Sequence, residues 1–202
     1  MKFLKIANYL FHPLWIPTFA TFYFFLKSPS IYEPQIIGAK LLAVSVLTFF
    51  LPAVILLILH YLRYIKSFEL SDVGERKFPL LIFTLIAAFI VRYVFNFNDF
   101  LALNLFFLGV FFSGIIMTLA ALLNLKISLH TAGISGLLIF VSILSYYFLV
   151  PGILGLAFLL IALGWTFSAR LASKAHTVLE LLLGIFVGGL PQLLVFMYGY
   201  SM

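Results

Sequence analysis

The chain has 202 residues, of which 65% are hydrophobic and 9% charged, and its formal net charge is +6 at pH 7. A soluble domain is about 45–50% apolar and about 25% charged, so a chain this apolar cannot cover its own surface with polar groups. The composition excludes a soluble globular protein and predicts an integral membrane protein. The absence of cysteine also excludes thiol nucleophiles, thiolate metal sites, iron–sulfur clusters and disulfides.

Seven apolar segments are long enough to be membrane spans, since a spanning helix needs roughly 20 residues. They are continuously apolar instead of alternating, which predicts helices that satisfy their own backbone groups in lipid. We therefore expect an all-α fold, a polytopic transmembrane helical bundle of six or seven spans forming a single integral membrane domain over residues 1–202. The expected spans are residues 9–26, 41–62, 79–97, 100–123, 132–149, 152–169 and 178–199.

Prolines and glycines mark irregular places in two of these spans. Pro13 and Pro17 interrupt the first segment, which we expect to be a retained span that is bent or only partly inserted. Gly184 and Gly188 should allow the last span to approach a neighbouring helix closely, and Pro191 should kink it. The polar residues inside spans are expected to donate interhelical hydrogen bonds; they are Asn104, Ser113 and Gln192.

The distribution of basic residues leaves the orientation open. If all seven segments span, nine Lys and Arg residues lie on the side of the N-terminus and three on the other, which favours a cytoplasmic N-terminus. Five of the nine belong to the candidate site, and without them the count is four against three. We expect a multi-pass protein of a bacterial cytoplasmic (inner) membrane.

Polar residues gather in three clusters, at residues 69–79, 126–131 and 168–180. Two predicted spans separate each cluster from the next, so the chain returns to the same membrane face each time. All three clusters can therefore converge at one end of the bundle. His12 and His60 are expected to have structural roles at the membrane interface, and Arg92 and Asp99 to lie at the opposite face.

The third cluster contains a histidine–carboxylate pair. His176 and Glu180 are four residues apart and share a helix face, so the carboxylate can fix the ring tautomer and leave Nε2 free as a nucleophile or base. The same spacing could supply two metal ligands, but His130 is the only obvious third ligand, and Arg170 and Lys174 would repel a dication. We expect no metal and no cofactor. A structural alternative is a helix-to-helix turn whose cations interact with lipid headgroups.

The second cluster adds a cation, a hydroxyl and a second imidazole, from Lys126, Ser128 and His130. Two imidazoles flanked by cations suit phosphoryl chemistry, in which cations hold the oxygens, one histidine attacks and the other protonates the leaving oxygen. We expect His130 and His176 to face one cavity at a membrane boundary, with Arg170 close to both.

These residues resemble the type 2 phosphatidic acid phosphatase superfamily (PAP2 superfamily) of membrane lipid phosphatases and haloperoxidases, of which the chain would be a divergent member. The third motif of that family, S-R-x5-H-x3-D, is matched in spacing by Arg170, His176 and Glu180, with Ala169 in the serine position and Glu in place of Asp. The resemblance covers about residues 124–199 and implies a PAP2-like core.

The other two motifs match less fully. The P-S-G-H motif is similar to Ile127-Ser128-Leu129-His130, which keeps the serine and the histidine. The K-x6-R-P motif is represented by Arg76 and a following proline, while Glu69 stands where the lysine would be.

The resemblance implies a lipid phosphate or diphosphate phosphatase that acts through a phosphohistidine. His176 would be the nucleophile, Glu180 would orient it and His130 would be the general acid. The phosphate would be held by basic and hydroxyl side chains: Arg170, Lys126, Ser128, Arg76 and Lys77. The substrate would be a membrane lipid phosphate such as phosphatidate, phosphatidylglycerol phosphate or a polyprenyl diphosphate; we expect no nucleic-acid partner.

Two other functions fit the sequence. A catalytically inactive member of the family could bind lipid headgroups or serve as a subunit of a membrane complex, and the missing lysine, the missing glycine and the Glu-for-Asp change favour it. A transporter is a weaker alternative, because no ionisable residue lies near mid-span.

Overall fold

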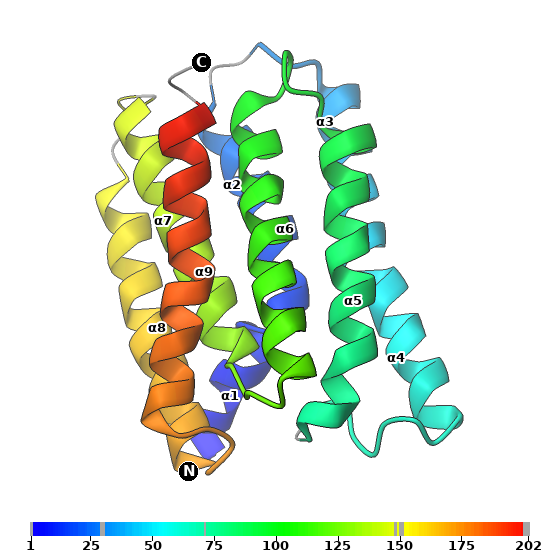
Figure 1. Cartoon of the computed structure of the whole chain (residues 1–202). Helices are drawn as coiled ribbons and strands as arrows, with labels where there is room; N and C mark the ends of the chain where they lie inside the picture. The colour runs from blue at the N-terminus through cyan, green and yellow to red at the C-terminus, as the bar shows by residue number, and fades with distance from the viewer. Residues whose placement is uncertain (1, 29–30, 71, 148, 150–151, 200–202) are drawn as a thin grey trace.

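The computed structural model describes residues 2–28, 31–70, 72–147, 149 and 152–199. Within these residues the chain is helical and contains no strand. Six helical segments are long and apolar enough to cross a membrane: Pro34–Tyr61, Val73–Val94, Leu101–Leu122, Leu129–Tyr147, Ile153–Ala172 and Val178–Gly199. The predicted all-α, multi-pass membrane bundle is confirmed, and Figure 1 shows its helices standing roughly side by side.

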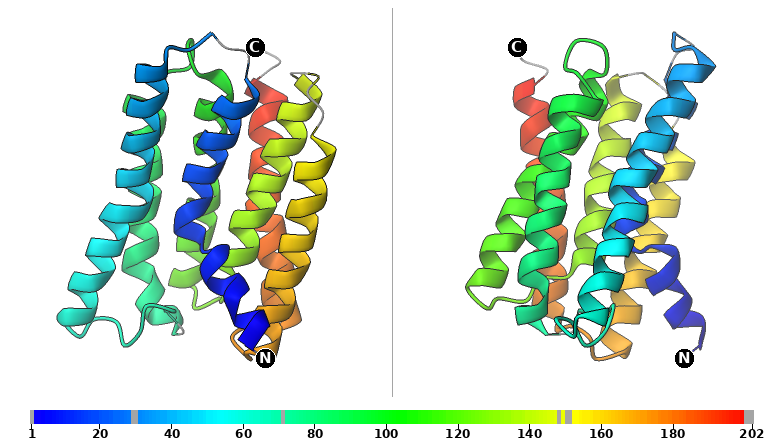
Figure 2. Two further views of the ribbon diagram at one scale, coloured as in Figure 1. Left: turned by 180° about the vertical axis from the view of Figure 1, so that it is seen from behind. Right: turned by 90° about the vertical axis from the view of Figure 1, so that its right-hand side faces the viewer.

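The first predicted span is two helices with a break between them. Helix α1 (Lys2–Leu10) ends before His12, a three-residue 3-10 turn follows (η1, Pro13–Trp15), and α2 (Ile16–Lys27) continues the chain. Pro13 lacks a backbone N–H and restricts the residue before it to extended geometry, and His12 has a ψ of 135°. Figure 2 shows that the broken segment still runs from the end with the N-terminus to the other end. The bundle thus has six long spans and one broken crossing.

The next two spans differ from the predicted ranges. The segment Pro34–Tyr61 consists of α3 (Pro34–Ser45), a π turn (η2, Val46–Phe50) and α4 (Leu51–Tyr61). Helix α5 (Val73–Phe89) begins six residues before the predicted start, because the Asp72 carboxylate caps it by accepting from Gly74 N (3.0 Å), and it runs through Pro79. It continues into a second π turn (η3, Ile90–Val94). Glu75 and Arg76 consequently lie on the first turn of a helix instead of in a loop.

The last four spans pack against one another around a core of buried side chains. Helix α9 (Val178–Gly199) packs against α7 (Leu129–Tyr147) and α6 (Leu101–Leu122). Helix α5 covers the other side of α6, and α8 (Ile153–Ala172) packs against both α7 and α1. Buried aromatic side chains such as Phe106, Phe107 and Phe140 fill the space between these helices.

Helices α7 and α9 touch through their backbones. A Cβ atom added at Gly188 would lie 2.0 Å from the carbonyl oxygen of Ala132, and one at Gly184 would lie 2.6 Å from the carbonyl oxygen of Ser128. This closeness lets Thr131 Oγ1 donate to Leu181 O at 3.0 Å. The close approach predicted from the two glycines is confirmed.

Buried polar side chains of α6 and α9 bond to backbone carbonyls. Pro191 has no N–H to offer Val187 O one turn earlier, and Ser113 Oγ donates to that carbonyl at 2.8 Å. Gln192 Nε2 donates to Phe106 O (2.9 Å) and Asn104 Nδ2 to Val91 O (2.9 Å). The predicted interhelical hydrogen bonds of Asn104, Ser113 and Gln192 are confirmed.

We predict that Gly188→Ala destabilises the protein by at least about 2 kcal/mol, since the added methyl meets backbone that cannot move aside without separating α7 from α9. Gly164→Ala in α8 is the matched control, because its Cβ would meet no atom within 4 Å. The measurement is thermal unfolding in detergent. Equal melting temperatures for the two variants would contradict the backbone contact.

Candidate functional site

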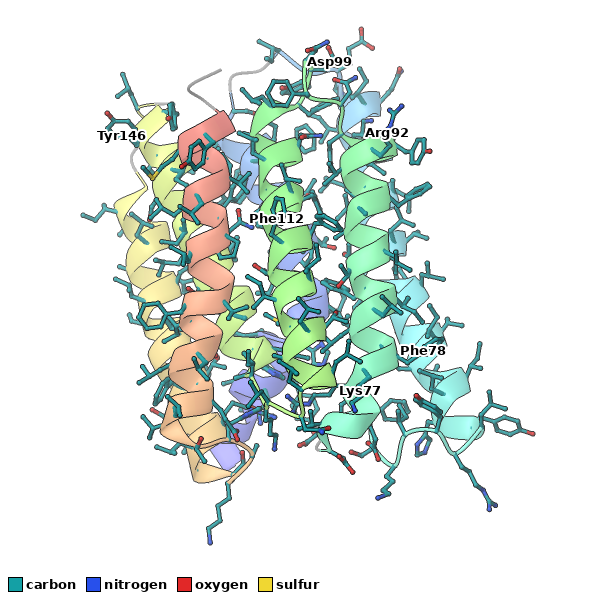
Figure 3. The ribbon with its side chains drawn as sticks, in the orientation of Figure 1. Lys77, Phe78, Arg92, Asp99, Phe112 and Tyr146 are labelled. Atoms are coloured by element: carbon teal, nitrogen blue, oxygen red, sulfur yellow. The ribbon has the colours of Figure 1, made fainter. Side chains whose placement is uncertain are left out.

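The three polar clusters lie at one end of the bundle, as the sequence predicts. We call it the site end; it carries the N-terminus and the connections after α4, α6 and α8 (Figure 1). Lys77 marks this end in Figure 3, whereas Arg92 and Asp99 lie at the opposite end. There Arg92 sits 5.4 Å from the ring centroid of Tyr93, and Asp99 accepts from Asn96 Nδ2 (2.7 Å).

His176 and Glu180 form the predicted pair. His176 Nδ1 lies 2.8 Å from Glu180 Oε2, and because a carboxylate only accepts, Nδ1 donates. The same Oε2 accepts from Thr177 N (3.2 Å), while Thr177 Oγ1 accepts from Glu180 N (3.3 Å). This reciprocal pair is a capping box that starts α9. Glu180 therefore has a structural role and also holds His176 with Nε2 free of its proton in the neutral ring.

The surroundings of His176 disfavour its protonated form. The side chain is buried in the turn between α8 and α9, and this burial lowers its pKa to about 4, with the charges of Arg76, Arg170 and Lys126 acting in the same direction. The hydrogen bond to Glu180 opposes the shift. At pH 7 the imidazole is thus neutral and its Nε2 carries a lone pair.

Two arginines are buried beside the histidine, and each is 4% exposed. Arg76 donates through Nε to Leu70 O (2.7 Å) and through Nη1 to Ile127 O (2.9 Å), so it ties two connections together. The Nε atom of Arg170 is buried and has no hydrogen-bond partner among the described residues. A buried donor without an acceptor is costly, which makes this end of the protein suited to an anion.

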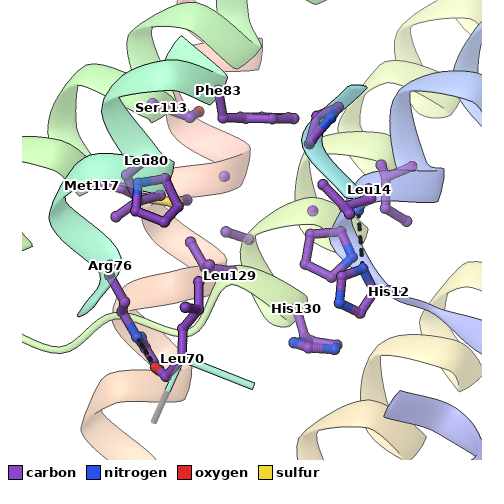
Figure 4. Close-up of a pocket in the computed structure, with 18 of the residues that line it drawn as sticks. His12, Leu14, Leu70, Arg76, Leu80, Phe83, Ser113, Met117, Leu129 and His130 are labelled. Carbon is purple, nitrogen blue, oxygen red and sulfur yellow. Dashed lines mark hydrogen bonds between the residues drawn. The ribbon is translucent and has the colours of Figure 1, made fainter. Parts of the chain in front are cut away.

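A cavity of about 490 Å³ opens beside these groups and is lined by His130, His176, Arg170 and Arg76. The part of the expectation that brings both histidines and Arg170 to one cavity is confirmed. Figure 4 shows Arg76 and His130 at its edge, with apolar side chains such as Phe83 and Met117 further along it.

Three predicted phosphate ligands do not line the cavity. Lys126 Nζ donates to Ala175 O (2.8 Å) and thereby braces the turn before His176. Ser128 is fully buried, and its Oγ accepts from Thr131 N (3.4 Å) at the start of α7. Lys77 is half-buried on α5 and is not among the residues that line the cavity. The hydrogen bonds of Lys126 and Ser128 therefore support the connections that carry the site.

The N-terminal segment supplies several lining residues for which the sequence predicts no role in the site, among them Asn8 and His12. The carbonyl oxygen of Asn8 accepts from His130 Nε2 at 3.1 Å. The ring of His12 lies edge-on to that of His130, with centroids 5.4 Å apart. The signal in the sequence was the proline after His12, which breaks the helix at a depth near the clusters. Glu69 is a further lining residue.

The cavity continues from the site end into the middle of the bundle. Its deeper lining is apolar and comes from α2, α4, α5 and α6: Ile16, Ile55, Phe83, Val110 and Met117. Gln192 lines it as well, and its Oε1 is buried without a hydrogen-bond partner in the described chain.

No family model, no curated protein and no solved structure matches this chain. Among the described residues, no group of three or more His, Asp or Glu side chains is arranged to hold a metal ion. The site combines a neutral imidazole with a free Nε2, a second imidazole and two buried guanidinium groups at the mouth of an apolar cavity.

We predict that His176 protonates near pH 4 in the folded protein, well below the ordinary value of 6.5. Because the folded pKa is the lower one, the stability contributed by His176 is complete above pH 6.5 and is lost as the pH falls toward 4. The measurement is imidazole NMR in detergent, with His176→Gln to identify the signal. A midpoint near 6.5 would contradict the buried, cationic surroundings.

Proposed function

We propose that this protein is a membrane phosphatase that hydrolyses a lipid phosphate or diphosphate through a phosphohistidine formed on His176. The observation that carries the proposal is the pairing, in one cavity, of an imidazole held by a carboxylate with an arginine whose buried Nε lacks an acceptor in the described chain. A phosphoryl group bound there supplies the acceptor that Arg170 lacks and a phosphorus atom for His176 to attack.

The apolar part of the cavity supports a lipidic leaving group. Gln192 follows Glu180 by 12 residues on α9, which is about 18 Å of helix, more than half of the roughly 30 Å hydrocarbon layer. An amphiphile with its phosphate at Arg170 would place an apolar chain against Phe83 and Met117. A small soluble phosphate ester would leave this surface uncovered, so the lining favours substrates drawn laterally from the membrane.

In the first half-reaction the Nε2 lone pair of His176 attacks phosphorus, and the bond to the leaving oxygen breaks. Glu180 balances the positive charge that develops on the ring, and Arg170 holds the phosphoryl oxygens. His130 gives a proton to the leaving oxygen. That proton comes from Nδ1 of a ring that the negative charge of the bound phosphoryl group would keep protonated, because the Nε2 proton is held by the carbonyl of Asn8.

In the second half-reaction water attacks the phosphohistidine. The phosphorus–nitrogen bond breaks and its electron pair returns to Nε2 of His176, while Nδ1 of His130 takes the proton of the water. Phosphate leaves, and both histidines regain their starting states. Lys126 and Ser128 support these residues through the hydrogen bonds described above and need not touch phosphate, and Lys77 does not line the cavity.

One observation favours the inactive, lipid-binding alternative. Leu129 lines the cavity where the resembled family has a glycine, and no lysine is among the described lining residues. A phosphate would then be held by arginines alone and approached less closely by backbone N–H groups.

The cellular membrane we propose is the bacterial cytoplasmic one, because helical spans are typical of it and β-barrels are typical of outer membranes.

We predict that the purified protein releases phosphate from lipid phosphates in liposomes without added metal, and that His176→Ala abolishes this release. Phosphatidate, phosphatidylglycerol phosphate and a polyprenyl diphosphate form the first panel. Turnover at the level of His176→Ala for every substrate would favour the lipid-binding alternative. Turnover that a chelator stops would favour metal-assisted chemistry instead.

We also predict that Glu180→Gln lowers turnover about a hundredfold or more, whereas Glu180→Asp retains much more activity. Glutamine can keep the capping box and accept from the ring, but it cannot balance the imidazolium charge. The Gln variant therefore tests the charge of Glu180 separately from its capping of α9. The measurement is the ratio of turnover numbers at saturating lipid, with monodisperse elution as the folding control. Equal turnover in both variants and wild type would leave Glu180 with a capping role only.

A further inference from the structure

His12 stands at the break in the N-terminal crossing and lines the same cavity as His130, Arg170 and His176. It is the N-cap of the 3-10 turn, where its Nδ1 accepts from Leu14 N at 3.4 Å (Figure 4). Pro13 at the first position of the turn fixes the backbone on which the ring is carried. The ring is therefore held by local structure and turned toward His130.

The cap determines the tautomer of His12. A backbone N–H only donates, so Nδ1 must carry a lone pair, and in the neutral ring the hydrogen is on Nε2. This Nε2–H has no acceptor among the described residues.

The other two imidazoles at the cavity have their N–H groups engaged. His130 donates through Nε2 to Asn8 O, and His176 donates through Nδ1 to Glu180. In their neutral rings the remaining nitrogens bear lone pairs, and in the proposed mechanism Nδ1 of His130 carries a proton only until it passes to the leaving oxygen. Among the three, only His12 offers the cavity a hydrogen-bond donor in its neutral form.

We propose that His12 donates a hydrogen bond from Nε2 to an oxygen of the phosphoryl group and stabilises the charge that grows there in the transition state. No proton is transferred in this role. A neutral imidazole suits the position because Arg76, Arg170 and, in the proposed mechanism, the protonated ring of His130 already place positive charge beside the site, and a further buried cation would be costly. This inference rests on the proposed function.

Two substitutions separate donation from capping. In His12→Asn the amide oxygen is attached to Cγ, as Nδ1 is, so it can keep the cap, but no donor reaches the place of Nε2. In His12→Gln the amide nitrogen lies one atom further out, near the place of Nε2, and the cap is weakened. The donor role predicts turnover about a hundredfold below wild type for Asn and at least about tenfold higher turnover for Gln than for Asn. The expected melting temperatures run the other way: His12→Asn melts above His12→Gln, because Asn keeps the cap.

A capping role alone predicts that turnover follows stability, with Asn near wild type and Gln below it. Turnover that follows stability in this way, or wild-type turnover in both variants, overturns the donor role of His12. The proposed function stands in either case if His176→Ala is inactive. Vanadate adds a second readout, because it takes the five-coordinate geometry of the transition state. His12→Asn should weaken vanadate inhibition more than it weakens inhibition by inorganic phosphate.

Failure of the proposed function is recognised separately, since wild-type protein would then turn over no lipid phosphate. If wild-type protein shows no turnover, donation from His12 Nε2 is tested by the rise in melting temperature that inorganic phosphate produces. A smaller rise in His12→Asn than in wild type supports donation to a bound anion. Equal rises overturn it.

Discussion

The backbone contact between α7 and α9 is the constraint on which the site end depends. Gly184 and Gly188 remove the side chains that would separate the two helices. The approach carries through to the connections, where Ser128 N donates to Glu180 O at 3.2 Å. It therefore brings the start of α7, with His130, next to the start of α9, with Glu180 and the preceding His176. Two clusters that are about 50 residues apart in the chain become one site because α9 carries glycine where it meets the backbone of α7.

Two buried guanidinium groups, those of Arg76 and Arg170, set the electrostatics around His176, and Glu69 also lines the cavity. Arg76 satisfies part of its guanidinium group on the carbonyls of Leu70 and Ile127, whereas Arg170 keeps an unpaired Nε in the described chain. Burial and these charges together lower the pKa of His176. The same arrangement that keeps the imidazole neutral thus attracts an anion, and a bound phosphoryl dianion would offset the charges at the moment when the ring becomes positive.

The broken N-terminal crossing adds to the site from a part of the chain where the sequence suggested only membrane anchoring. A continuous helix through residues 9–26 would leave no N-cap at His12. Because Pro13 ends α1, the carbonyl of Asn8 meets His130 and the ring of His12 enters the cavity. In the proposed mechanism the segment orients one histidine and contributes another.

The sequence by itself determined the membrane bundle, the positions of most spans and the shared end of the three clusters. The length of the apolar segments predicts the spans, and the number of spans between the clusters predicts their shared end. The four-residue spacing predicts the His176–Glu180 pair, because it places both side chains on one helix face. The start of α5 was predicted too late, because Pro79 is tolerated early in a helix that Asp72 caps.

Only the tertiary structure decided which polar residues reach the cavity. Lys126 is close to His130 in the chain, yet its hydrogen bond to Ala175 O, 49 residues away, turns it to a framework role. His12, more than 100 residues away, lies beside the His130 ring. The reason is physical: spacing along one helix is set by local geometry, whereas the direction of a side chain at a helix end depends on which backbone groups of other helices lie within reach of it.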